Sequence, residues 1–317
     1  MPEFSIKEAA LTGFRFAREN PGAILVWALV SIIGTAIYYL IFVSMAGEAI
    51  VQMQALQEQA QTDPQAVDPG QMFSAMGQMM TGTFVGFIPL FVASVMITAA
   101  ATRAILRPEA RGLGFVRFGA DELRLIAVLI VVGILLGLIY FVGTIVSGII
   151  AFAVIGAGGG GPPAPGELPA GMMAALLPPM LLAGLIMLYV YSRFSLAPPL
   201  TLDRRAINIF SSVAMTKGRS GRVFRTYLLA LLLYLVVAIL GACIFAGIGA
   251  AMTGDMAELQ AFFTEPDMSS VEAFMSPLRI VYLVFMSVIG ALGAAIMLTP
   301  PAAIYRAITA EGVDEVF

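Results

Sequence analysis

The stretch Leu125–Ile155 reads LIAVLIVVGILLGLIYFVGTIVSGIIAFAVI and contains no charged residue. A helix that crosses the hydrocarbon core of a bilayer needs about 20 mostly apolar residues. This stretch is longer than that, so we expect a membrane-spanning helix that is tilted or that projects beyond the bilayer. The stretch therefore predicts an α-helical membrane protein.

Five other stretches have the same character. They are Gly22–Ser44, Gly82–Ala104, Met172–Ala197, Thr226–Ala251 and Ile280–Thr299. Of the 317 residues, 60% are hydrophobic and only 12% are charged, whereas soluble domains carry about a quarter charged residues. The mean hydropathy is +0.94. We therefore predict an all-α membrane protein with six transmembrane helices in a single polytopic domain, residues 1–317.

The ends of these stretches also carry expectations. Gly22–Ser44 is longer than the roughly 7–15 apolar residues of a secretory signal, so we expect an uncleaved helix. Pro178 interrupts the fourth stretch, and we expect it in the first turn of the true crossing, because a proline costs little there. Ala46–Ala60 is predicted to form a helix within an outer loop, and Gly156–Gly166 (GAGGGGPPAPG) to form a flexible spacer.

The charges are segregated along the chain. All of the 17 Lys and Arg residues except Arg279 lie in the amino-terminal stretch, in Arg103–Arg124, in Arg193–Arg225, or at Arg306 near the carboxyl end. The three intervening polar stretches are acidic. Basic residues stay in the cytoplasm during membrane insertion. We therefore expect a multi-pass protein of the bacterial inner (plasma) membrane with both termini in the cytoplasm. An even number of crossings agrees with basic residues at both ends, because it places both termini on the same side.

Composition also excludes several classes of function. The chain has no His and a single Cys, Cys243, so we expect no disulfide, no catalytic histidine and no metal site. No basic domain indicates nucleic acid as a partner. The apolar stretches hold no acidic residue at their middle, where ion-coupled transporters keep one. We expect no cofactor and no enzymatic activity.

Three similar units are predicted, over residues 1–110, 111–202 and 203–317. In each, a short amphipathic segment leads into an outward helix, and a return helix follows. Ser5 and Glu8 have the spacing of a capping box, so we expect a helix to begin there. Apolar faces at helical spacing are expected in the first and third lead-in segments. These faces are Ile6, Ala10, Phe14 and Ala17 in the first, and Ile207, Phe210, Val213 and Ala214 in the third.

A basic cluster follows the third lead-in segment. It consists of Lys217, Arg219, Arg222 and Arg225. Beside a membrane, such residues hold anionic lipid head groups, and each charge contributes about 1 kcal/mol. The same residues also act as an orientation signal, and one arrangement is able to do both. We take this cluster as the candidate lipid head-group site.

Two further features have a functional and a structural interpretation. Asp121 and Glu122 lie at the start of the third crossing, close to Arg124, and are either a gate for ions or protons or simply acids that stabilise a helix start. The spacing of Gly133 and Gly137 predicts a close helix contact.

The segment Tyr191–Tyr227, YSRFSLAPPLTLDRRAINIFSSVAMTKGRSGRVFRTY, joins an arginine-containing helix end to a proline-rich exit. A Ser…Thr-x-Gly-Arg…Phe sequence follows. This order resembles the membrane domain attached to some bacterial glycerophosphoryl diester phosphodiesterases, and related stand-alone six-helix membrane proteins of unknown function. The hydrolase of that family is a separate soluble domain with no counterpart here. The resemblance therefore implies a stand-alone membrane module, near lipid or glycerophosphodiester metabolism.

From these features we expect a non-enzymatic membrane module that binds lipid, including anionic lipid, or a protein partner, including a second copy of itself. The alternative is a transporter or channel subunit for a small or amphipathic solute. A polar cavity between the helices favours the alternative, and a closed apolar bundle favours the module.

Overall fold

The computed structural model describes residues 4–63, 68–157 and 170–314, which are helices joined by short turns, with no strand among them. Six helices are long and apolar enough to cross a membrane. Contacts divide the chain into two compact units. Unit 1 comprises Met1–Ala10, Gly119–Ala230 and Pro300–Phe317, and unit 2 comprises Leu11–Phe118 and Leu231–Thr299. The helix α9 (Ser220–Thr253) belongs to unit 1 at its start and to unit 2 beyond Ala230.

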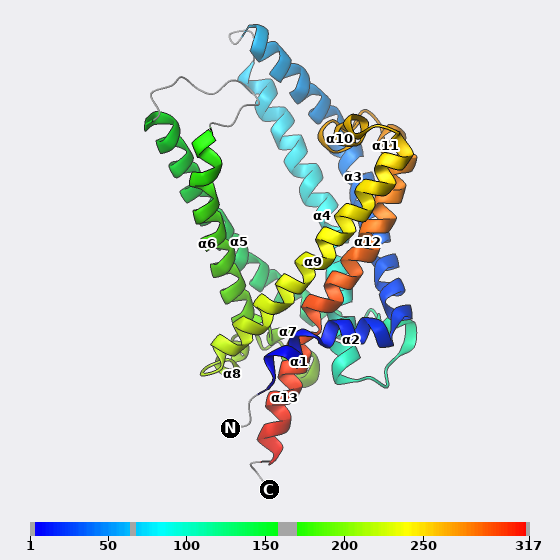
Figure 1. The fold of residues 1–317 in the computed structure, drawn as a ribbon, viewed down its shortest axis with the longest axis vertical. Helices are drawn as coiled ribbons and strands as arrows, with labels where there is room; N and C mark the ends of the chain where they lie inside the picture. The colour runs from blue at the N-terminus through cyan, green and yellow to red at the C-terminus, as the bar shows by residue number, and fades with distance from the viewer. Residues whose placement is uncertain (1–3, 64–67, 158–169, 315–317) are drawn as a thin grey trace. The chain divides into compact units, whose positions relative to one another are not determined.

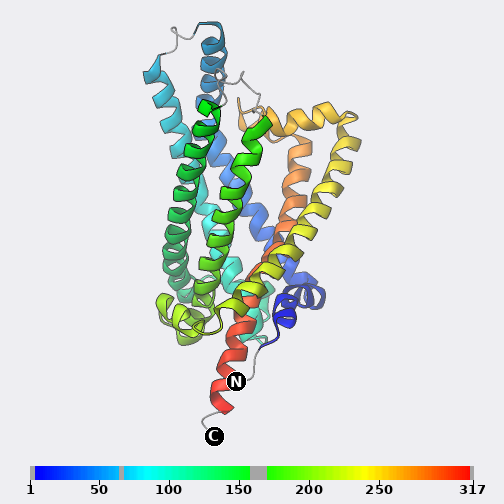
Figure 2. The same ribbon diagram turned by 60° about the vertical axis from the view of Figure 1, so that its left-hand side comes forward.

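Unit 2 is built around the hairpin of α3 (Pro21–Thr62) and α4 (Pro69–Leu106), which run side by side (Figures 1 and 2). Small residues let the two backbones approach closely. A Cβ placed on Gly34 would lie 2.9 Å from the Cβ of Ala93, and one on Gly82 would lie 2.9 Å from that of Ala46. The helix expected over Ala46–Ala60 is confirmed, but it is not separate from the crossing, because α3 continues without a break to Thr62.

The core of unit 2 lies where α2 (Thr12–Glu19) meets α3, the 3-10 turn η1 (Gly112–Phe115) and α12 (Pro277–Leu298). Trp27 is fully buried and stacks on Phe16, with ring centroids 5.2 Å apart. Arg103, at the end of α4, is also buried and donates a hydrogen bond to the carbonyl oxygen of Phe115, 2.6 Å away. This bond fixes the turn that follows the α3–α4 hairpin.

In the remainder of unit 2, α10 (Met256–Thr264) and α11 (Val271–Phe274) lie between α9 and α12 in sequence. Phe245, Leu259 and Leu278 form a small apolar core that joins these elements. The side chains of Asp255 and Ser270 cap α10 and α11 by accepting hydrogen bonds from Ala257 N–H and Ala273 N–H. The region is thus a folded cap on the ends of α9 and α12.

Unit 1 is built around α5 (Ala120–Ala157) and α6 (Ala170–Phe194), again side by side (Figures 1 and 2). It also contains α1 (Ile6–Ala10), α7 (Ala197–Arg204), α8 (Ile209–Met215) and α13 (Pro300–Asp314). Gly143 of α5 packs closely against α6, because an added Cβ would lie 3.0 Å from the Cβ of Ala183. The spacer predicted over Gly156–Gly166 lies outside the described residues beyond Ala157.

Two expectations about the crossings of unit 1 are wrong. Pro178 is not in a first turn, because α6 begins at Ala170 and holds Pro178 and Pro179 inside it. Neighbouring groups and local adjustments satisfy the freed backbone in transmembrane helices, so a proline pair need not end one. Gly133 and Gly137 make no close contact, because an added Cβ at either position meets no atom of the described chain within 4 Å.

The lead-in segments are helical, but their faces differ from the expected ones. Ser5 caps α1 as predicted, accepting a hydrogen bond from Glu8 N–H at 3.3 Å. The helix then breaks at Leu11, so the face of Ile6, Ala10, Phe14 and Ala17 is not continuous. Phe16 is buried in place of Phe14, which is 38% exposed. The break rotates α2 relative to the helical register that the sequence suggests.

Candidate functional site

The end of α6 and the short helices after it form a corner of unit 1 that is tied by side-chain hydrogen bonds. Arg193, in the last turn of α6, donates to the carbonyl oxygens of Val213 (3.0 Å) and Thr216 (3.3 Å). These carbonyls lie at the carboxyl end of α8, where Val213 O also accepts from the Thr216 hydroxyl and Thr216 O also accepts from Arg219 N–H, both at 3.1 Å. Arg193 therefore caps α8 and fixes where its last residues lie relative to α6.

Ser212 of α8 makes a reciprocal connection. Its hydroxyl donates to the carbonyl oxygen of Arg193 at 2.8 Å and accepts from the backbone N–H of Leu196 at 3.2 Å. Ser212 and Leu196 are both fully buried. Because a buried polar group without a partner is costly, these bonds specify one position for α8. They lie inside the segment Tyr191–Tyr227 that carries the family resemblance.

The buried face of α8 is formed by Ile209 and Ser212, together with Thr216 just beyond the helix. Two residues of the apolar face predicted for this segment are exposed, Ile207 by 54% and Phe210 by 70%, and the ring of Phe210 also meets that of Phe194 with centroids 6.2 Å apart. An apolar face that the protein leaves uncovered beside a transmembrane helix is typical of a segment at the membrane interface. The sequence predicted this apolar face, but it did not predict that two of its residues would be exposed.

The basic cluster predicted from the sequence, Lys217, Arg219, Arg222 and Arg225, begins directly after α8 and ends in the second turn of α9. We call it the α9 basic cluster. Lys217 and Arg225 are exposed, and Arg219 and Arg222 are partly exposed. The turn is closed by hydrogen bonds from Lys217 N–H to Ala214 O and from Arg219 N–H to Thr216 O, both 3.1 Å. Gly218 takes a positive φ of 79°, which a residue with a side chain rarely adopts.

The electrostatics at the start of α9 favour an anion. A helix amino terminus carries a partial positive charge, which acidic residues ordinarily offset. The first turn of α9 contains no acidic residue. Arg222 and Arg225 instead lie three apart on one helix face, where like charges repel. The four basic residues and the helix terminus therefore lie together in the short segment Lys217–Arg225.

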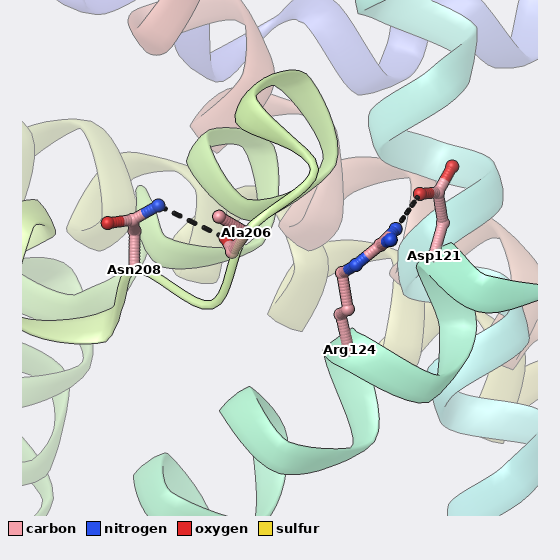
Figure 3. A network of polar contacts seen from close by, with 4 residues as sticks. All are labelled: Asp121, Arg124, Ala206 and Asn208. Atoms are coloured by element: carbon pink, nitrogen blue, oxygen red, sulfur yellow. Dashed lines mark hydrogen bonds and ion pairs between the residues drawn. The ribbon is translucent and has the colours of Figure 1, made fainter.

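The start of α5 has the opposite arrangement. Its first turn contains Asp121 and Glu122, and the carboxylate of Asp121 accepts a hydrogen bond from Arg124 at 2.8 Å (Figure 3). Glu122 is 1% exposed. This geometry suits the structural interpretation, in which the acids stabilise the helix start, and the gate remains a prediction. Figure 3 also shows Asn208, whose side-chain amide donates a hydrogen bond to the carbonyl oxygen of Ala206 at 3.1 Å within the turn between α7 and α8.

Two contacts of this corner were not predicted from the sequence. The hydroxyl of Tyr305 in α13 donates to the carboxylate of Asp203 in α7 at 2.7 Å. Tyr191 and Tyr227 meet edge to face with ring centroids 5.3 Å apart. Neither pair has a local sequence signal, because the partners come from different helices.

The described residues contain no group of three or more His, Cys, Asp or Glu side chains arranged to hold a metal ion. Cys243 is a free, exposed cysteine on α9.

Fold and composition together define a multi-pass α-helical membrane protein with six candidate membrane-spanning helices. No family model, curated protein or solved structure matches the chain.

Proposed function

We propose that this protein is a non-enzymatic module of the bacterial inner membrane that binds anionic lipid head groups at the α9 basic cluster. One observation carries the proposal. The residues Lys217, Arg219, Arg222 and Arg225 surround a helix start that has no acidic residue, next to the exposed apolar stripe of α8. Phosphate groups bind at helix amino termini that arginine and lysine surround.

The two parts of this surface suit the two parts of a lipid. Ile207 and Phe210 offer apolar area to acyl chains, and the α9 basic cluster offers positive charge to the head group. Interfacial segments that combine these properties bind membranes through the burial of apolar area and through electrostatic attraction to anionic lipids. Four charges near an anionic surface contribute up to about 4 kcal/mol in total.

The proposed orientation has the α9 basic cluster and both termini in the cytoplasm. It is supported by the distribution of basic residues, of which only Arg279 lies in the opposite connecting stretches. The three sequence repeats of residues 1–110, 111–202 and 203–317 remain part of the proposal. After each pair of crossings, one side-chain hydrogen bond holds the following segment: that of Arg103 to Phe115 O, that of Arg193 to Val213 O, and that of Tyr305 to Asp203.

Native mass spectrometry with lipid analysis tests the proposal. The purified protein is compared with a variant in which Lys217, Arg219, Arg222 and Arg225 are all changed to Gln. We expect the wild type to retain phosphatidylglycerol or cardiolipin in preference to phosphatidylcholine, and the variant to lose this preference. Raising the salt concentration should weaken the preference, since these charges are exposed.

A charge-matched variant is the control. It changes one Lys and three Arg that are exposed elsewhere in the polar stretches: Lys7, Arg111, Arg117 and Arg205, all to Gln. It should keep the lipid preference of the wild type. Equal lipid profiles for the wild type and both variants would contradict the proposal, leave the cluster as an orientation signal, and place solute transport first.

A further inference from the structure

A second polar feature lies in unit 2, around the start of α12. The three acidic stretches that connect the crossings contain one basic residue, Arg279. Its side chain is only 8% exposed. Burial of a cation is costly unless an anion or hydrogen bonds compensate it. How this guanidinium is compensated therefore indicates what its surroundings are built to hold.

Two aromatic rings and one carbonyl hold the guanidinium. Its central carbon lies 3.8 Å from the ring centroid of Phe262 and 4.6 Å from that of Phe274. One terminal nitrogen donates to the carbonyl oxygen of Phe262 at 2.9 Å. The Nε atom is buried, and no acceptor for it is found in the described chain. The planar group is thus fixed in position while much of its donor capacity is unused.

The aromatic rings are themselves held in place. Phe262 and Phe263 of α10 pack edge to face at 4.9 Å, and Phe245 of α9 meets Tyr282 of α12 at 5.0 Å. Phe274 packs against Tyr39 of α3 at 4.9 Å. Arg279 therefore lies in a preorganised frame and is not on a free loop.

Arg279 lines an open pocket of about 470 Å³ between α10, α11 and the start of α12. Glu258, Glu265 and Asp267 line the same pocket, and all three are exposed. Within the ranges that the structure describes, none of them forms an ion pair with Arg279. Hydrogen bonds from the hydroxyl and the N–H of Ser269 lower the pKa of the Asp267 carboxyl.

The pocket thus presents one fixed cation and several carboxylates that do not neutralise each other by contact. The geometry points to a zwitterionic ligand, with its phosphate or carboxylate on Arg279 and its primary ammonium group among Glu258, Glu265 and Asp267. The pocket opens where a candidate membrane-spanning helix begins, so two sources supply this chemistry: the head group of phosphatidylethanolamine, and a free solute such as O-phosphoethanolamine.

Lipid competition tests the pocket. Native mass spectrometry is run on the full chain with phosphatidylethanolamine, phosphatidylglycerol and phosphatidylcholine. We expect the wild type to retain phosphatidylethanolamine over phosphatidylcholine, and over phosphatidylglycerol as well once the α9 basic cluster is changed to Gln, because only its head group pairs a phosphate with an ammonium that donates hydrogen bonds. The variant Glu258→Gln, Glu265→Gln, Asp267→Asn should lose this preference by about tenfold or more, since a charged hydrogen bond contributes about 1.5–3 kcal/mol.

The triple variant alters exposed side chains, so its folding is not at risk in the way that Arg279→Gln is. Arg279→Lys is the second probe, because it keeps the charge and loses the planar fork. It should weaken retention of phosphatidylethanolamine while thermal unfolding still shows a cooperative transition. The control is Glu48→Gln with Glu272→Gln, two exposed acidic residues that do not line the pocket. It should behave as the wild type.

Added O-phosphoethanolamine separates the two sources. Displacement of the lipid assigns the pocket to a soluble zwitterion, and retention of the lipid assigns it to the bilayer. No preference for phosphatidylethanolamine in the wild type, or an unchanged preference in the triple variant, would overturn the inference. The Gln variant of the α9 basic cluster should keep the phosphatidylethanolamine preference, so failure of one site is distinguishable from failure of the other.

Discussion

The indole N–H of Trp27 donates a hydrogen bond to the carbonyl oxygen of Gly114, 2.8 Å away and 87 residues later in the chain. This bond joins the first turns of α3 to the turn η1 that follows α4. Leu113, Gly114 and Phe115 all have positive φ there, at 44°, 63° and 65°. Two of these residues have side chains, so the turn is strained. The bonds from Trp27 and Arg103 and the burial of Phe115 offset that strain.

Changing Trp27 to Phe should therefore destabilise unit 2. Phe fills most of the buried volume but leaves the carbonyl of Gly114 without its donor, at a cost of about 1–3 kcal/mol. Thermal unfolding in detergent measures the effect. Tyr140→Phe, which removes an exposed hydroxyl on α5, is the control and should leave the midpoint unchanged. An unchanged midpoint for Trp27→Phe would show that the hydrogen bond from Trp27 does not stabilise the turn.

Gly13 should tolerate no side chain. A Cβ at this position would lie 2.4 Å from the carbonyl oxygen of Ala295 and 2.5 Å from the Cα of Ile296. Both are backbone atoms of α12, so α2 would have to move away, at a cost of about 1–3 kcal/mol. Gly133→Ala is the matched control, because no atom of the described residues outside its own helix turn lies within 4 Å of an added Cβ. A loss of stability in Gly133→Ala, equal to that in Gly13→Ala, would contradict the packing and indicate a contact with another molecule.

Arg193 should act as a positioning residue for the α9 basic cluster. Arg193→Gln removes the cap from Val213 and Thr216, which lie directly before Lys217. We expect a loss of about 1–3 kcal/mol in stability and a weaker preference for anionic lipid, although all four cluster residues remain. Arg117→Gln removes an exposed charge elsewhere and should change neither quantity. If Arg193→Gln lowers stability but leaves the lipid preference intact, the corner is structural only.

Single-cysteine labelling tests the orientation. In a Cys243→Ser background, a cysteine at Glu272 should react with a membrane-impermeant maleimide in intact cells. A cysteine at Ala206, which is also exposed but lies on the basic side, should react only after permeabilisation. The reverse pattern would invert the topology and place the α9 basic cluster outside.

Several features were determined by the sequence itself because their causes are local or additive. Six apolar stretches predict six crossings, since the length of a spanning helix is set by the bilayer. The cap of Ser5 on α1 follows from a spacing of three residues. The composition of the α9 basic cluster and of the α5 helix start is likewise readable from the chain.

Other features were decided only by the tertiary structure. The acceptors of Arg193, the pocket around Arg279, and the close approach at Gly13, with none at Gly133, all depend on which helix faces meet. In water, apolar periodicity reveals the buried face of a helix. In a bilayer the lipid-facing side is as apolar as the packed side, so the pattern of a crossing such as Leu125–Ile155 does not distinguish them. Packing of small residues and polar bonds between helices makes that choice, and neither has a local signature.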